Sequence, residues 1–248
     1  MGPAQVSAEP RPAFYALARG GWRDYVTLLH LPYTLWHLSY VAIGASLAPE
    51  LQANRLLWGL AAFLLALGVG AHALDELHSR PLGTEISSRV LVWLAAASLA
   101  GAVAIGVGAA VAWTLWLLPF VAAGAFLVPA YTLELGGGIF HTDLWFGLAW
   151  GAFPVLVAYL GAAETLRPEA FIAAAFALLA SLAQRSLSTQ VRLVRRRVAT
   201  VTGTLSYRDG HEEPLDAATL ARAPEAALRA LSLAMVLLAV ALVWLQLG

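Results

Sequence analysis

The 248-residue sequence contains no cysteine. This absence excludes disulfides, iron–sulfur ligation, cysteine zinc sites and thiol catalysis. The sequence also contains no lysine, so all 15 basic residues are arginines. A seven-helix retinal protein needs a lysine for its Schiff base, and the missing lysine therefore excludes that class.

Charge of either sign is scarce. Charged residues make up 12% of the chain and apolar residues 60%, whereas a soluble domain carries roughly 25% charged residues. Such a chain cannot coat a globule with polar surface, but it suits a protein whose solvent is lipid. The formal net charge is zero and no acidic or basic tail is present, so nothing indicates a nucleic-acid partner.

Seven segments are long and apolar enough for a membrane-spanning helix, which needs roughly 20 residues. They predict an all-α, polytopic transmembrane helix bundle. The apolar stretch that holds the third and fourth spans is about twice as long as one bilayer crossing, so it is predicted to turn between Gly106 and Trp113. The expected spans run from about His30 to Ala48, from Leu56 to Leu77, from Arg89 to this turn, from the turn to Leu133, from Asp143 onward, from Pro168 onward, and from Ala226 to Leu247.

The arginines divide unevenly between the expected loops. Only Arg55 and Arg167 fall on one side, which leaves 13 of the 15 on the other side together with the N-terminus. Because cytoplasmic loops carry an excess of arginine and lysine, this asymmetry predicts a multi-pass protein of the cell membrane with a cytoplasmic N-terminus.

The expected spans divide the chain into four parts. Residues 1–27 form a polar, proline-containing lead-in that lacks the features of a signal peptide and is read as disordered or interfacial. Residues 28–197 form a six-span bundle with a polar cavity on the cytoplasmic side. Residues 198–225 form a cytoplasmic loop with a turn at Tyr207–Gly210 and a short helix from Leu215 to Arg222. Residues 226–248 form the seventh transmembrane helix.

Ionisable side chains collect at the cytoplasmic end of the second span, at His72, Asp75, Glu76 and Ser79. Spacings of three and four residues place these side chains within about 100° on one helix face. An imidazole with two carboxylates suits a divalent cation or general acid–base chemistry. Polar groups in spanning helices are costly, so this face is a candidate site, although a helix end that emerges into water is the simpler reading for Arg80.

The loop between the fourth and fifth spans carries Glu134, the glycines 136–138, His141 and Asp143. Three glycines make a flexible turn that lets the backbone approach a ligand. Glu134 and His141 are candidates to face the same cavity as Asp75. Asp143 is open to two interpretations, a further site residue or the N-cap of the fifth span.

The end of the sixth span is basic, and Gln184, Ser188 and Arg192 share one of its faces. Arginine binds phosphate or carboxylate through two hydrogen bonds, so Arg185 and Arg192 are candidate phosphate ligands. The alternative is an anchor that faces anionic lipid headgroups, which is the favoured interpretation for Arg195–Arg197.

In their order along the chain, these motifs resemble the UbiA superfamily of intramembrane prenyltransferases over roughly residues 28 to 205. Leu31-Pro32-Tyr33-Thr34 resembles the opening proline–threonine signature of the family, and residues 80–87 resemble the stretch that follows its first aspartate-rich motif. Ala130-Tyr131-Thr132 and the glycine-spaced residues 147–161 resemble its fourth and fifth helices. In the first motif one aspartate of three remains, Asp75, and the position of the second acidic motif has become basic. The seven expected spans compare with nine in most of the family.

The resemblance implies a divergent prenyltransferase that moves a polyprenyl group from its diphosphate to a lipophilic acceptor among the membrane lipids. Magnesium ions at the acidic motifs of the family bind the diphosphate. Asp75 and Glu76 are therefore expected to hold one Mg²⁺, with His72 beside them as a catalytic residue. The expected substrate-binding residues are Arg80, Glu134, His141, Arg185, Ser188 and Arg192, the arginines replacing the second metal in stabilising phosphate charge.

Two other functions stay open. A non-catalytic membrane protein that binds lipid or quinone on the same scaffold would explain the loss of the second acidic motif. A membrane metalloenzyme could use the histidines together with the carboxylates as a nitrogen and oxygen ligand set for iron, zinc or manganese. One of these histidines, His37, lies in the first span, where a hydrogen bond to a neighbouring helix is the commoner role.

Overall fold

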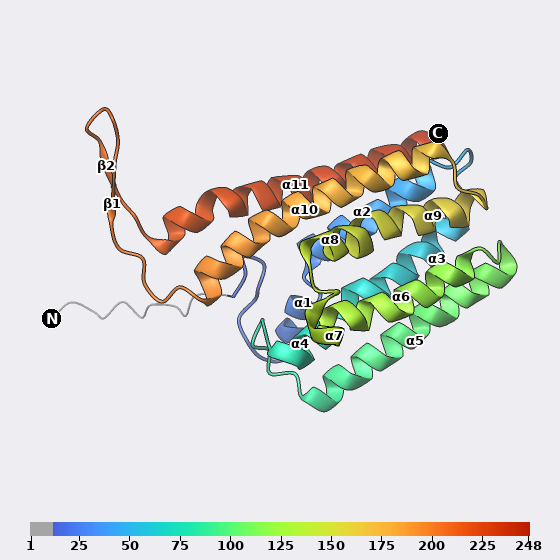
Figure 1. Ribbon diagram of the computed structural model, residues 1–248, viewed down its shortest axis with the longest axis horizontal. Helices are drawn as coiled ribbons and strands as arrows, with labels where there is room; N and C mark the ends of the chain where they lie inside the picture. Colours follow the sequence, from blue (N-terminus) through green and yellow to red (C-terminus); the bar gives the residue numbers. More distant parts are fainter. Residues whose placement is uncertain (1–11) are drawn as a thin grey trace.

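The structure, a computed structural model, describes residues 12–248, so the part of the N-terminal lead-in at residues 1–11 lies outside the described residues. It is mostly helical, at 74%, and the long helices lie side by side along one axis (Figure 1). The helical prediction is confirmed. The elements are α1 (Trp22–Leu28), α2 (Leu31–Ser46), α3 (Ala53–Phe63), η1 (Leu64–Ala71), α4 (His72–Ser79), α5 (Ser88–Ala112), α6 (Leu117–Thr132), α7 (Leu135–Gly138), α8 (Asp143–Phe146), η2 (Gly147–Ala152), α9 (Phe153–Ala163), α10 (Pro168–Arg196), β1 (Thr204–Ser206), β2 (Glu212–Pro214) and α11 (Ala217–Leu247).

Five helices of the described chain are long and apolar enough to cross a membrane. At 1.5 Å per residue, the 25 residues of α5 extend over roughly 37 Å, more than the hydrocarbon thickness of a bilayer. A shorter apolar helix, α6, lies beside α5. The five are Ala53–Ser79 (α3, η1 and α4 in one continuous run), Ser88–Ala112, Asp143–Ala163 (α8, η2 and α9), Pro168–Arg196 and Ala217–Leu247.

Helix α2 lies at the centre of the bundle and packs against α3, α9 and α11. Small residues let the backbones approach closely, as in other membrane helix pairs. A Cβ atom at Gly44 of α2 would lie 2.4 Å from the carbonyl oxygen of Val155 in α9, and a Cβ at Gly151 would lie 2.5 Å from that of Ala177 in α10. These two contacts fix the continuous run of η2 and α9, with η2 against α10 and α9 against α2.

Two of the long helices contain π-helical segments, η1 at Leu64–Ala71 and η2 at Gly147–Ala152. A π-helical segment changes the hydrogen-bond ladder, and such segments occur often at functional sites. In η2 the carbonyl oxygen of Trp150 is 2.9 Å from Nδ1 of His37 in α2. The interhelical hydrogen bond expected of His37 is therefore present.

Two boundaries differ from the sequence prediction. The turn between α5 and α6 lies at residues 113–116 and so begins at the last residue of the expected interval, because α5 continues to Ala112. The short helix expected from Leu215 to Arg222 and the expected seventh span are one continuous helix, α11, with Pro224 inside it. The rest of the segment 198–225 contains the hairpin of β1 and β2, whose register pairs Leu205 with Glu213.

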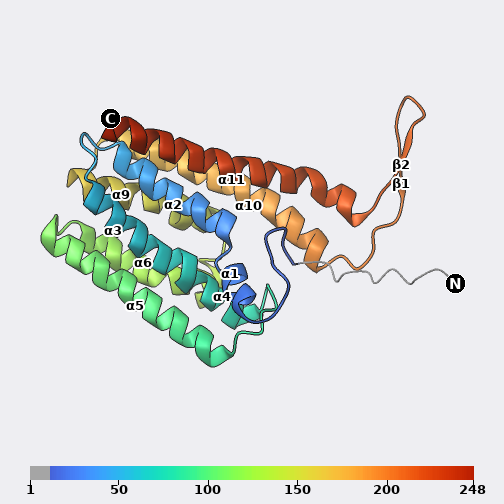
Figure 2. The ribbon, with the colours of Figure 1, turned by 180° about the vertical axis from the view of Figure 1, so that it is seen from behind.

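The described part of the N-terminal segment packs onto the bundle. Ala13 and Ala16 are buried, and the backbone nitrogen of Leu17 donates a hydrogen bond to Oγ1 of Thr27, at 3.0 Å. From residue 12 onward the reading as a disordered or interfacial lead-in is therefore replaced by a folded segment. This segment lies at the same end of the bundle as α4 and the hairpin, opposite the C-terminus (Figures 1 and 2).

Candidate functional site

At this end of the bundle, four aromatic rings form a chain that joins the N-terminal segment to α4. Tyr15 lies against both His30 and Tyr33, with ring centroids 5.3 and 5.5 Å apart. His30 in turn stacks on His72 at 4.0 Å, with the planes 16° apart. His30 precedes α2 in the left-handed backbone conformation, at φ 45°, which is uncommon for a non-glycine residue and occurs often at functional sites.

Asp75 lies half-buried below this chain of rings, within the electrostatic reach of the basic end of α10. The positive charges of Arg192 and Arg196 act favourably on its carboxylate, and the negative charges of Glu76 and Glu134 act against it. The same two arginines act on Tyr15 and Tyr33. Helices α4 and α10, far apart in the sequence, thus hold one carboxylate and two guanidinium groups within electrostatic reach of one another.

Burial raises the pKa of the Tyr15 hydroxyl far above its ordinary value, and neighbouring Tyr33 raises it further. The positive charges of Arg196 and Arg192 only partly oppose this effect. Tyr15 therefore stays protonated at physiological pH and contributes a neutral hydroxyl to the site.

Arg185 of α10 connects three helices. Its Nε donates a hydrogen bond to the carboxylate of Asp143 in α8, and one of its terminal nitrogens donates to the hydroxyl of Tyr131 in α6. Its guanidinium carbon also lies 5.1 Å from the ring centroid of Phe146. Because a guanidinium has five N–H donors, these two bonds leave donors for a ligand.

Asp143 is the first residue of α8, and Thr142 caps the helix, so the N-cap interpretation of Asp143 is wrong.

Arg192 and Arg196 have no carboxylate within 4.0 Å among the described residues. Arg192 donates a hydrogen bond to Oγ1 of Thr189 (2.8 Å) and Arg196 donates one to the carbonyl oxygen of Pro12 (3.1 Å). A half-buried charge without a direct ion-pair partner is costly, and such groups occur often at functional sites. These two arginines can therefore receive an anionic group.

Glu76 and Arg80 are committed to the loop that joins α4 and α5. The fully buried carboxylate of Glu76 accepts hydrogen bonds from the backbone nitrogens of Leu82 (3.0 Å) and Thr84 (2.7 Å), and from Oγ1 of Thr84. Arg80 donates to the carbonyl oxygens of Thr84 (3.2 Å) and Ile86 (2.6 Å). These contacts give both side chains a structural role, so Asp75 is the carboxylate of α4 that remains for a ligand.

The loop between α6 and α8 orients His141 toward Tyr131. Nδ1 of His141 lies 2.9 Å from the carbonyl oxygen of Tyr131, and the two rings stack at 4.5 Å. Glu134 is half-exposed and lies 4.0 Å from the same nitrogen. Ser188 faces inward, and its hydroxyl donates to the carbonyl oxygen of Arg185 within its own helix.

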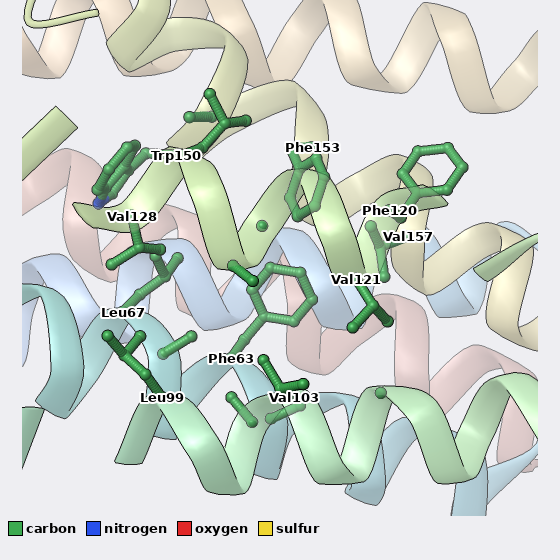
Figure 3. Close-up of a pocket in the computed structure, with 18 residues that line it drawn as sticks. Phe63, Leu67, Leu99, Val103, Phe120, Val121, Val128, Trp150, Phe153 and Val157 are labelled. Carbon is green, nitrogen blue, oxygen red and sulfur yellow. The ribbon is translucent and has the colours of Figure 1, made fainter. Parts of the chain in front are cut away.

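An apolar cavity of about 100 Å³ lies within the bundle, among residues of α3, α5, α6 and α9. Trp150 lines this inner cavity (Figure 3) and its ring lies 4.4 Å from the ring of Tyr131. Tyr131 does not line this cavity itself, but its contact with Trp150 places the hydroxyl-bearing ring next to a wall of the hydrophobic space. The other labelled lining residues are Phe63, Leu67, Leu99, Val103, Phe120, Val121, Val128, Phe153 and Val157.

The expected site residues come together only in part. Asp75, Arg185 and Arg192 share an electrostatic neighbourhood around Tyr131, whereas Glu76 and Arg80 face the loop. Sequence reasoning did not assign Tyr15, His30 and Arg196 to the site. The sequence offered little evidence for these three residues. Tyr15 lies before the expected first span and His30 begins it. Arg196 lies within a run of arginines that is typical of an anchor to lipid headgroups.

The histidines are dispersed. His37 bonds to Trp150, His72 stacks on His30, and His141 stacks on Tyr131. Among the residues that the structure describes, no group of three or more histidine, aspartate or glutamate side chains is arranged to hold a metal ion. The interpretation as a histidine–carboxylate metalloenzyme gains no support from this arrangement.

No protein-family model matches the chain, and neither a curated protein nor a solved structure matches it.

Proposed function

We propose that this chain is a divergent UbiA-like intramembrane prenyltransferase with seven membrane spans. In this proposal the end that carries Asp75 and the arginines faces the cytoplasm, as the arginine distribution predicts. The enzyme moves a polyprenyl group from its diphosphate to a lipophilic acceptor. The observation that carries the proposal is the pair Arg192 and Arg196, which have no carboxylate within 4.0 Å among the described residues and share the electrostatic neighbourhood of Asp75, in a bundle that also contains an apolar cavity.

This combination matches an amphiphile with a highly charged head and a hydrocarbon tail. A diphosphate is recognised by arginine through charge-assisted, paired hydrogen bonds. The three guanidinium groups of Arg185, Arg192 and Arg196 would surround such a head. The tail would pass Tyr131 and Trp150 into the inner cavity, where burial stabilises it by roughly 0.8 kcal/mol per CH₂ group.

One Mg²⁺ fits this arrangement through Asp75. Magnesium is commonly bound by one or two carboxylates together with substrate phosphates, so a single aspartate beside a diphosphate is a sufficient protein contribution. When bound, the ion would neutralise charge on the leaving diphosphate. The residue expected as its second ligand, Glu76, is held by Leu82 and Thr84.

The reaction needs positive charge where the leaving group departs. The bond between C1 of the prenyl group and the diphosphate oxygen breaks, and its electron pair leaves with the diphosphate. C1 forms a bond to the acceptor, whose proton passes to water. Fixed guanidinium groups at this position stabilise the departing oxygen, because they are oriented before the charge develops.

The test is prenyl transfer by protein reconstituted in nanodiscs. Pyrophosphate release from farnesyl and geranylgeranyl diphosphate is measured with Mg²⁺ and a total lipid extract as acceptor source. We expect Asp75→Asn and Arg192→Gln each to reduce release about a hundredfold or more, while the exposed Arg197→Gln, from the same helix end, retains it. Release at the wild-type rate by Asp75→Asn would sink the proposal.

One observation favours a second candidate, a non-catalytic binder of lipid or quinone. Glu76 has a structural role, and α10 offers basic residues where the resembled family has acids. In that case the protein would retain a lipophile through purification and would release no pyrophosphate from either diphosphate, whichever variant is used.

A further inference from the structure

A second apolar cavity, of about 60 Å³, continues the inner cavity toward the far end of the bundle. The two cavities share five lining residues, Ala62, Phe63, Gly106, Val121 and Val157. Among these, Phe63 has the largest side chain, and its ring stands in the middle of the space in Figure 3. The two cavities therefore adjoin, with Phe63 in the wall that they share, and the pair is called the apolar channel below.

Aromatic contacts hold Phe63 in this position. Its ring meets the ring of Phe153 edge to face, with centroids 6.1 Å apart, and Phe153 lies 5.9 Å from Phe120. A Cβ atom added at Gly124 would lie 3.3 Å from the ring of Phe153, so this glycine leaves room for the group. The shared wall is thus a packed feature of α3, α6 and α9.

The charged side chain of Arg55 lines the outer cavity on the side of Trp113 and Gly161. Arg55 lies 5.3 Å from the ring centroid of Trp113 and donates hydrogen bonds to the carbonyl oxygen of Gly161 (3.0 Å) and to Glu164 (2.8 Å). An apolar chain gains nothing by entering this polar side. Along α6 the lining of the channel extends from Leu117 to Val128, which are eleven helical steps or roughly 16 Å apart.

We propose that this channel accepts the single hydrocarbon tail of the prenyl substrate, and that Phe63 sets the tail length by limiting entry to the outer cavity. The proposal rests on the proposed function for the identity of the substrate. With Phe63 in place, the tail ends in the inner cavity. A smaller residue at position 63 opens the outer cavity, and longer tails then bury additional CH₂ groups.

The test measures binding rather than turnover. The probes are the farnesyl and geranylgeranyl thiolodiphosphates, which resist cleavage, titrated against protein in nanodiscs. We expect Phe63→Ala to raise the affinity for the geranylgeranyl probe relative to the farnesyl probe about tenfold. Ala62→Phe, which fills the shared segment, should weaken binding of both probes. The control Phe171→Ala removes an exposed phenylalanine of α10 and should leave the ratio unchanged.

The outcomes separate this inference from the proposed function. An unchanged ratio in Phe63→Ala, with Ala62→Phe still weakening both probes, would overturn the role of Phe63. The expected change in ratio without pyrophosphate release from the natural diphosphates would support the channel and refute the transferase. Pyrophosphate release together with equal binding of both probes by every variant would refute the channel alone.

Discussion

The guanidinium of Arg185 in α10 pairs with the carboxylate of Asp143 at the start of α8. The side chain of Asp143 is 77% exposed and that of Arg185 only 14%. An ion pair with one exposed partner contributes little free energy of folding. Under the proposed function, a diphosphate would displace Asp143, while the hydrogen bond to Tyr131 would keep Arg185 in place.

This geometry distinguishes two substitutions at the same ion pair. Arg185→Lys cannot reproduce the forked contact to Asp143 and Tyr131, and we expect it to weaken binding of farnesyl thiolodiphosphate roughly tenfold or more. Asp143→Asn removes a competing carboxylate and should leave the affinity unchanged or raise it severalfold. The measurement is equilibrium titration in nanodiscs. Equal weakening by both substitutions would show that Asp143 contributes to ligand binding rather than competing with it.

Adjacent carboxylates of α4 should respond in opposite ways to amide substitution. In Glu76→Gln the new NH₂ group faces backbone N–H donors of Leu82 or Thr84, and we expect a loss of about 2–3 kcal/mol in the free energy of unfolding. Asp75 has no hydrogen bond among the described residues, so Asp75→Asn should change stability by no more than about 0.5 kcal/mol. Thermal unfolding in detergent, read by circular dichroism, compares the two. A Glu76→Gln protein that is as stable as the wild type but has lost Mg²⁺-dependent activity would show that Glu76 is a metal ligand and not a structural residue.

Two glycines offer a matched test of helix packing. In Gly44→Ala the new methyl group lies too close to the carbonyl oxygen of Val155, and we expect a loss of about 2 kcal/mol or more as α2 and α9 separate. A Cβ at Gly108 of α5 would meet no atom within 4 Å, so Gly108→Ala should gain up to about 1 kcal/mol from helix propensity. Unfolding by sodium dodecyl sulfate in mixed micelles measures both. Equal effects at the two positions would contradict the packing of α2 on α9.

The absence of cysteine makes topology directly measurable, because any cysteine introduced is the only thiol in the chain. Arg208→Cys places it in the hairpin turn, and Asn54→Cys places it at the opposite end of the bundle, where α3 begins. With an impermeant maleimide on intact cells, we expect Asn54→Cys to react and Arg208→Cys to react only after lysis. The reverse pattern would invert the proposed orientation.

Hydropathy was sufficient to locate the helices, since each long apolar segment corresponds to a helix or a continuous helical run. It could not place the turn at residues 113–116, because no charged residue marks that interval. The expected break between residues 222 and 226 is also absent, although Pro224 lies in that interval. Proline removes one backbone donor and favours a helix break, but the structure continues the helix through it.

Helical spacing placed His72, Asp75 and Glu76 on one face but could not show what each one meets. The partner of Glu76 is a loop up to eight residues away, and the partner of His72 is His30 of another segment. These contacts depend on how the chain turns after Arg80 and before α2. Periodicity carries no information on such turns. The contacts of these side chains could therefore be assigned only from the structure.

The central claim is that an anionic head lies among the arginines of α10 while its tail fills the apolar channel. The most direct measurement uses a farnesyl diphosphate analogue with a diazirine on its terminal isoprene unit, photolysed in nanodiscs and mapped by peptide mass spectrometry. We expect adducts at the channel residues Phe63, Val121 or Val157, which are lost on competition with unlabelled farnesyl diphosphate. Adducts confined to lipid-facing residues such as Val111, unaffected by that competitor, would contradict the claim.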